Sequence, residues 1–185
     1  NFATSSGLTR LRLQASLKTG DVELSRRIAT SLAISGLSIT DQVNLAKTLS
    51  DLKLPERGRE LLDSIRFRVP FSNLREVMNT YDALGAKDSA IEIAKEIVRK
   101  TVYEASWDSP SNTFALNNQP NARQEALKYL ASAGALAALR DEIRKQYEAA
   151  PGFERTAIQL VNICAEMGDI AMETELRKKF NRPSP

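Results

Sequence analysis

A short turn recurs at nearly constant intervals along this chain, and the repeat restricts the possible folds more than any other feature. Four glycines each follow an apolar-periodic segment of about 14 residues and precede a shorter amphipathic one; they are Gly20, Gly85, Gly134 and Gly168. Lys53 occupies the same place in a fifth pair of segments. Because glycine tolerates the left-handed backbone that commonly ends a helix, these five turn positions predict five antiparallel helix pairs.

The spacing of the turn positions gives a period of 32 to 34 residues, and only the step from Gly85 to Gly134 is longer, at 49 residues. The excess falls in residues 105–119, which are rich in Ser and Asn and lack sustained helical periodicity. Prolines 17 residues after three turn positions mark where second helices should end; they are Pro70, Pro151 and Pro185. We therefore expect one solenoid over residues 1–185, with an inserted loop at 105–119 and units near 6–38, 39–70, 71–104, 120–153 and 154–185.

Apolar residues three and four positions apart predict the buried face of each helix. The clearest unit carries Leu74, Val77, Met78 and Tyr81 in its first helix, and the weakest is expected to bury Leu8, Leu11, Ala15, Val22, Ile28, Ala29 and Leu32. The residues five positions after the turn positions, where helices must approach closely, are Ser25, Gly58, Ala90, Leu139 and Glu173, and the first three of them are small. The predicted fold class is all-α, a right-handed superhelical α-solenoid of about five antiparallel helix hairpins.

Composition excludes several kinds of chemistry. The chain has no His and one Cys, so it contains neither a Ser-His-Asp or Cys-His nucleophile system nor a zinc finger or intrachain disulfide. No acidic pair, such as Asp82 with Glu166, is placed convincingly for catalysis, and we expect a non-enzymatic protein without metal or cofactor. The net charge of +3 comes from scattered basic residues, so we expect no nucleic-acid partner.

Nothing in the sequence predicts membrane insertion or targeting. No run of about 18 apolar residues occurs, and no charged start precedes an apolar stretch, so we expect neither a transmembrane segment nor a signal peptide in this fragment. The single Cys164 is compatible with a cytoplasmic location and with a bacterial cell envelope. We expect Cys164 to be a buried small apolar residue, since no neighbouring cation pattern would activate its thiol.

Residues 71–102 carry a likeness to a known repeat family. Six residues fall on spaced signature positions of that family, namely Leu74, Val77, Tyr81, Gly85, Ala90 and Ile97. The chain resembles the tetratricopeptide repeats, a helix-turn-helix family of about 34 residues per unit, over roughly residues 6–185. The signature Trp is replaced in every unit, and Glu173 replaces the small packing residue of the last one. Pentatricopeptide-type RNA binders have a similar period, but the weak net charge argues against them.

The resemblance implies a protein–protein interaction scaffold that binds a peptide or a helical partner in a concave groove lined by the first helices. Amides suit this task because Asn and Gln both donate and accept hydrogen bonds. The groove positions carried over from the family are Arg10, Gln14, Asn44, Lys47, Arg75, Asn79, Gln124, Lys128, Gln159 and Asn162. Asn79 and Asn162 lie where related repeats often hold peptide main chain. The alternatives are solvated polar faces at these positions, and an architectural spacer or self-association segment as the role of the chain.

The inserted loop contributes two further candidates for partner contact, Trp107 and Phe114. Long loops in compact folds are often functional, and Trp is enriched in binding hot spots. The alternative is that both aromatic side chains pack back onto the solenoid and replace stacking contacts between the third and fourth units.

Overall fold

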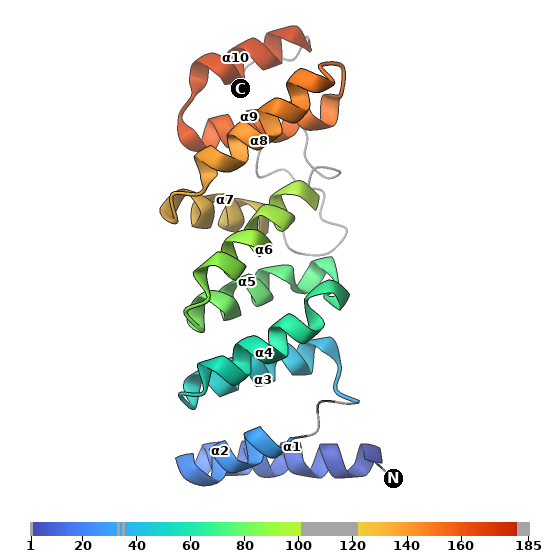
Figure 1. Cartoon of the computed structure of the whole chain (residues 1–185), viewed down its shortest axis with the longest axis vertical. Helices are drawn as coiled ribbons and strands as arrows, with labels where there is room; N and C mark the ends of the chain where they lie inside the picture. The colour runs from blue at the N-terminus through green and yellow to red at the C-terminus, as the bar shows by residue number, and fades with distance from the viewer. Residues whose placement is uncertain (1, 33, 35, 101–121, 181–185) are drawn as a thin grey trace. The chain divides into compact units, whose positions relative to one another are not determined.

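The computed structural model describes residues 2–32, 34, 36–100 and 122–180, with the backbone alone described for residues 2–8 and 10. The described part is helical throughout and contains no strand (Figure 1), which confirms the predicted all-α class. Its elements are α1 (Phe2–Thr19), α2 (Val22–Ser31), α3 (Ile39–Asp51), α4 (Pro55–Ile65), η1 (Arg66–Arg68), η2 (Phe71–Asn73), α5 (Leu74–Ala83), α6 (Lys87–Lys100), α7 (Ala122–Ser132), α8 (Leu136–Ala149), α9 (Glu154–Met167) and α10 (Ile170–Lys179). The predicted loop at 105–119, with Trp107 and Phe114, lies outside the described residues.

The chain divides into two compact units, Asn1–Ala90 and Ile91–Pro185, and the boundary falls within α6. In the first unit α1 packs on α2, α3 packs on α4, and α3 also packs on α5. In the second unit α7 packs on α8, and α9 packs on α7, α8 and α10. The pairs α1–α2, α3–α4, α7–α8 and α9–α10 therefore form hairpins, and the first helices of two successive hairpins touch where α3 meets α5 and where α7 meets α9.

All five predicted turn positions adopt the left-handed backbone. The φ angles are 75° at Gly20, 60° at Lys53, 70° at Gly85, 71° at Gly134 and 71° at Gly168. At each position the backbone closes two hydrogen bonds; beside Lys53 its own N–H donates to Ser50 at 2.9 Å and the N–H of Leu54 donates to Leu49 at 2.8 Å. This pair of bonds is the Schellman motif, which satisfies carbonyls that a helix end leaves unpaired. The repeat read from the sequence is thus a repeat of backbone geometry.

The second helix of a hairpin begins directly after its turn. The carboxylate of Asp21 accepts the N–H of Leu24 at 3.0 Å at the start of α2. Asp169 does the same for Met172 at 3.2 Å at the start of α10. Pro55 begins α4, where its missing N–H costs nothing because the first N–H groups of a helix have no intrahelical partner. Local capping therefore fixes the short connection that holds the two helices antiparallel.

Aliphatic side chains fill the core between these helices, as predicted. The fully buried positions include Leu62, Ile65, Leu74, Ile93, Ile97, Leu130, Leu139, Ile143 and Leu160. Gly58 meets the prediction of close helix approach, because a Cβ atom there would lie 2.6 Å from Leu84 Cδ2 and 3.0 Å from the Ala46 carbonyl oxygen. Glu173, at the equivalent place in α10, instead forms a largely buried ion pair with Arg177 at 2.9 Å.

The predicted core of the first hairpin is wrong in part. Leu11 is 62% exposed and Val22 is 50% exposed, whereas Leu13 and Ser16 are buried. The reason is the helix register. Leu13 and Ser16 stand seven and four residues before the turn position, and the residues at those two places in α3 are buried too. Of the other residues expected there, Ala29 and Leu32 are buried, Ile28 is half-buried, Ala15 is exposed, and the Leu8 side chain is not described.

Candidate functional site

A pocket of about 240 Å³ lies between α1 and α3 in the first unit, and we call it the α1–α3 pocket. Two helices and one connection supply its walls. The lining residues are Leu13, Gln14 and Leu17 from α1, Leu32 and Leu37 from the connection between α2 and α3, and Asp41, Asn44, Leu45 and Thr48 from α3. Five leucines make the lining predominantly apolar, while two amides, one hydroxyl and one carboxylate add polar groups.

The size and chemistry of this pocket suit one apolar side chain together with polar groups beside it. A dry apolar cavity of about 150 Å³ admits benzene, so the larger α1–α3 pocket has room for a phenyl ring or a branched aliphatic group. Gln14 and Asn44 are exposed, and their amides offer a donor and an acceptor each. Among the described residues of the lining, Asp41 is the one charged side chain, so this part of the pocket favours a neutral or cationic ligand.

The N-cap residue of α3, Ser38, positions the polar side of the pocket. Ser38 precedes α3, and its Oγ accepts the N–H of Asp41 at 3.1 Å while donating to Asp41 Oδ2 at 2.9 Å. Gln42 Nε2 donates to the carbonyl of Leu37 at 2.8 Å, and Gln42 is buried. These bonds anchor the connection between α2 and α3 to the first turn of α3. The Leu37 and Asp41 sides of the pocket are therefore held by the same local contacts.

Two of the ten predicted groove residues meet at this pocket, Gln14 and Asn44. The structure leaves Lys47, Asn79 and Lys128 exposed and half-buries Arg75 and Gln124. For Arg10 it describes no side chain.

The two groove residues predicted in α9 are buried, each with 6% of its surface exposed. Gln159 Nε2 donates to the carbonyl of Arg99 at 3.2 Å, and Asn162 Nδ2 donates to the carbonyl of Ile158 at 2.8 Å. Both amide nitrogens are therefore bonded within the chain. The sequence pattern placed these residues on a first helix but carried no information about which neighbour covers that face.

Gln159 also lines an open pocket of about 380 Å³ in the second unit, with Arg99, Gln146, Ala150, Phe153, Arg155 and Thr156. Arg99 Nη2 donates to both carboxylate oxygens of Glu142, at 2.8 and 2.7 Å. Arg155 Nη2 donates to the carbonyl of Arg99 at 3.3 Å. Because both arginines are bonded to protein groups, they contribute less free positive charge to this pocket than their number suggests.

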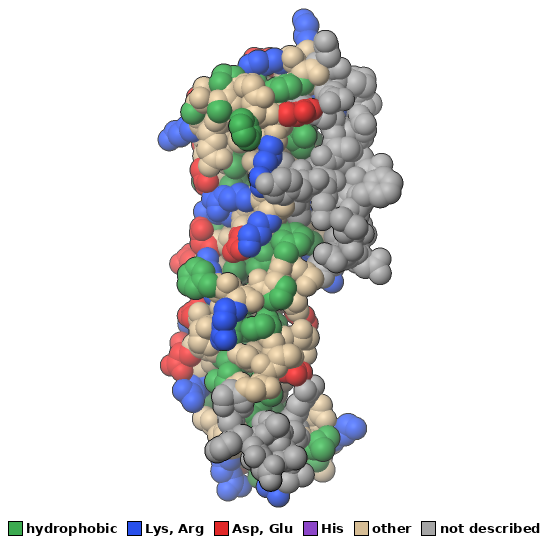
Figure 2. Space-filling model, turned by 90° about the vertical axis from the view of Figure 1, so that its right-hand side faces the viewer, with side chains coloured by type: hydrophobic (Ala, Val, Ile, Leu, Met, Phe, Trp, Pro, Cys, Tyr) green, Lys and Arg blue, Asp and Glu red, His purple; other side chains and the backbone are tan. Residues whose placement is uncertain are grey.

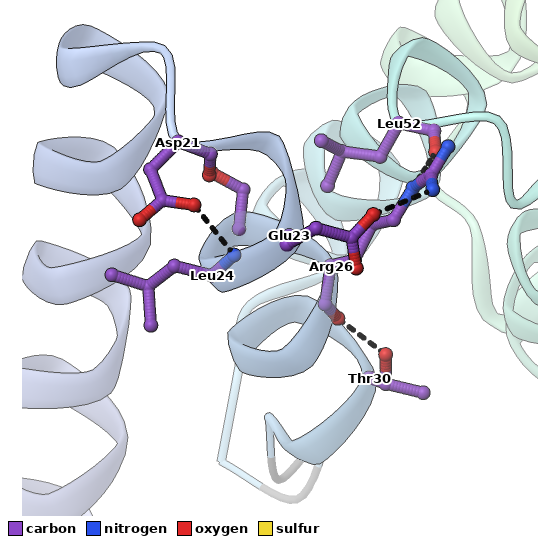
Figure 3. A network of polar contacts seen from close by, with 7 residues as sticks. Asp21, Glu23, Leu24, Arg26, Thr30 and Leu52 are labelled. Atoms are coloured by element: carbon purple, nitrogen blue, oxygen red, sulfur yellow. Dashed lines mark hydrogen bonds and ion pairs between the residues drawn. The ribbon is translucent and has the colours of Figure 1, made fainter.

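Two arginines that the sequence predictions did not include connect successive hairpins. Arg26 Nε donates to the carbonyl of Leu52 at 2.9 Å (Figure 3), and Arg59 donates to the carbonyl of Leu84 through Nε at 3.1 Å and Nη2 at 2.7 Å. Each arginine therefore caps the C-terminal end of the next first helix, where a cation is favourable. The sequence signal was present, because both arginines stand six residues after a turn position. Arg140 stands at the same place but bonds Asp141, at 2.9 and 2.8 Å.

Two buried titratable groups favour their neutral forms. Burial raises the pKa of the Cys164 thiol to about 11, and the charge of Asp169 adds to the shift. The prediction that Cys164 is a buried small residue is confirmed. Burial also raises the pKa of Tyr81, whose hydroxyl donates to Asp63 Oδ1 at 2.7 Å. Neither group is prepared to act as a nucleophile at neutral pH.

On the face shown in Figure 2, basic, acidic and apolar side chains of the described residues are interspersed, and charges of one sign do not gather in a patch. Among the residues that the structure describes, no cluster of three Asp, Glu or Cys side chains is arranged to hold a metal ion. In the same residues, no helix is long and apolar enough to span a membrane. No protein-family model matches the chain, and neither a curated protein nor a solved structure matches it.

Proposed function

We propose that this chain is a non-enzymatic protein–protein interaction scaffold that binds an extended peptide or a partner helix along the first helices of its hairpins. The observation that carries the proposal is the α1–α3 pocket. Gln14 and Asn44 come from the first helices of two successive hairpins and line one pocket with five leucines. Most of a pocket that binds a ligand is apolar, and a few polar groups orient what enters.

The pocket chemistry defines the ligand. One aliphatic or aromatic side chain would enter among Leu13, Leu17 and Leu45, and the amides of Gln14 and Asn44 would bond the adjacent main chain. An extended peptide exposes both N–H and C=O groups, which Asn and Gln can match from a single side chain. A peptide with a cation beside its apolar residue fits best, because Asp41 is the one charged group among the described lining residues.

The finer architecture is part of the same proposal. We infer that the hairpins stack in the right-handed manner of tetratricopeptide repeats. Five left-handed turn positions and the contacts between first helices within each unit support this arrangement. Small-angle X-ray scattering of the chain would show an elongated particle with the curvature of such a superhelix, and a compact globular profile would exclude it.

A displayed library of random peptides, selected against the whole chain, tests the function. Wild type should enrich peptides with one apolar residue next to Lys or Arg, and the double variant Gln14→Ala/Asn44→Ala should bind them at least about tenfold more weakly, since two hydrogen bonds to the peptide are lost. The matched control is Lys18→Ala/Asp51→Ala, which alters exposed residues on α1 and α3 outside the pocket lining.

Enrichment of no sequence, or equal binding by the two double variants, would reject the pocket as the binding site. Asn79 in the first unit and Asn162 in the second each remain a proposed main-chain contact of a groove within its own unit. Replacing Asn79 by alanine should weaken binding of the selected peptides without changing the stability of the protein, because this side chain is exposed. Asn162→Ala needs a parallel stability measurement, since its amide bonds the α9 backbone. Unchanged affinity in both variants would remove these two residues from their grooves.

A further inference from the structure

Phe67 is 96% exposed, the largest exposure among the large hydrophobic side chains of the described residues. It occupies the middle of η1, between Arg66 and Arg68, after the end of α4. A single exposed apolar residue is ordinary on a protein surface. An almost completely exposed phenyl ring between two cations is a different feature, because Phe and Arg are both enriched in protein–protein interfaces relative to the rest of a protein surface.

The backbone around Phe67 is anchored. Ile65 is fully buried on one side, Val69 is 8% exposed on the other, and the N–H of Val69 donates to the carbonyl of Arg66 at 3.4 Å. Two core residues therefore fix the short helical turn and direct the ring away from the protein. We call Arg66, Phe67 and Arg68 the Phe67 knob. A preorganised knob loses less conformational freedom on binding than the same three residues in a flexible loop would lose.

The α1–α3 pocket of the same chain has the complementary properties. Its leucines surround a space that admits a phenyl ring, and the one charged residue in its described lining is acidic, whereas the knob carries a phenyl ring and two cations. The pocket and the knob are formed by different elements, so each copy of the chain presents both. The ligand chemistry deduced from the pocket, an apolar side chain next to a cation, is therefore exposed on the chain itself.

We propose that the chain self-associates, with Phe67 of one copy inserted among the leucines of the α1–α3 pocket of a second copy and with Arg66 and Arg68 beside Asp41. The inference uses the pocket of the proposed function and names a second copy as one occupant. The contact joins two different surfaces, so it is heterologous. It closes into a dimer if the two copies exchange knobs, and otherwise extends from copy to copy.

Sedimentation velocity of the whole chain over a concentration series provides the test. Wild type should shift to larger species as concentration rises, and Phe67→Ala should weaken association by at least about tenfold, as truncation of a hot-spot aromatic does. Because the ring is exposed, the variant should retain the wild-type circular dichroism and unfolding midpoint. The matched control is Phe153→Ala, which removes another exposed ring, 65% exposed, and should leave association unchanged.

A mixing experiment distinguishes a knob in a pocket from other contacts. Leu17→Lys places a cation on the pocket wall at a residue that is 42% exposed, and should also remove association. The Phe67→Ala protein keeps its pocket and the Leu17→Lys protein keeps its knob. Each alone should be monomeric, and their mixture should form one-to-one pairs.

Three outcomes would overturn the proposal. They are a wild-type chain that is monomeric at every concentration, association that survives Phe67→Ala, and a mixture of the two variants that stays monomeric. Peptide selection on the Phe67→Ala chain separates this failure from failure of the proposed function, because that variant retains Gln14 and Asn44. If it binds selected peptides while wild type does not self-associate, the pocket binds partners other than this chain.

Discussion

Lys53 occupies the left-handed conformation that glycine adopts at the other four turn positions, and replacing it tests the repeat directly. Its φ angle is 60°, and among the described residues it is the one non-glycine residue with a positive φ. The left-handed conformation costs a residue with a Cβ atom about 1–2 kcal/mol. Glycine avoids this cost, but its greater conformational freedom stabilises the unfolded chain by about 0.5–1 kcal/mol. We therefore expect Lys53→Gly to raise the free energy of unfolding by about 0.5–1 kcal/mol.

The structure makes this estimate simple, because the Lys53 side chain is exposed and its loss removes no core packing. Urea unfolding followed by circular dichroism at the helix band measures the change in midpoint at constant slope. For a chain of this length, about 1 kcal/mol corresponds to a rise of about 2–4 °C in melting temperature. Lys53→Ala should differ little from wild type, because alanine keeps the Cβ atom and therefore the strain.

Lys47→Gly is the matched control, since it makes the same substitution at an exposed position inside α3. There glycine should lower stability by about 1 kcal/mol, because it adds freedom to the unfolded chain and relieves no strain. The same substitution should therefore change the free energy of unfolding in opposite directions at two positions six residues apart. If Lys53→Gly were destabilising, or if both variants moved in the same direction, the assignment of Lys53 to a strained turn position would be refuted.

Three further predictions concern contacts that hold the hairpins. Arg59→Met should lower the free energy of unfolding, measured with urea, by about 1–2 kcal/mol because it removes a charge-assisted helix cap. The control Arg57→Met loses only an exposed ion pair and should lower it by less than about 0.5 kcal/mol. Equal costs would contradict the capping role. Tyr81→Phe should cost about 1 kcal/mol near neutral pH by losing the bond to Asp63. Because the folded-state pKa of Tyr81 is raised, its stabilising contribution is complete below the unfolded pKa of about 10 and is lost at higher pH, so the stability of wild type should fall more steeply than that of the variant above about pH 10. Cys164 should react with a thiol reagent only after unfolding, because its neutral thiol is buried; rapid native-state labelling at pH 7 would show that α9 opens.

The features of this fold that are predictable from the sequence are those with a local cause. The turn positions were readable because the left-handed conformation at residues such as Gly85 depends on a single residue and a few backbone bonds. Prediction from the sequence was less successful for the first hairpin, where loosely patterned apolar residues suggested Leu11 and Val22 as core. The register set by the turn, rather than the apolar content of the helix, places Leu13 and Ser16 inside.

The sequence by itself determined the helical class, the period and the positions of the five turns within hairpins, because helix propensity, capping and glycine conformation act over a few residues. Only the tertiary structure decided which polar residues are accessible. Gln14 and Asn44 lie 30 residues apart in sequence and share one pocket, whereas Gln159 and Asn162 occupy comparable positions and are buried. Exposure of Phe67 likewise depends on how Ile65 and Val69 pack. Accessibility is a property of what neighbouring helices cover, and a pattern within one helix does not contain it.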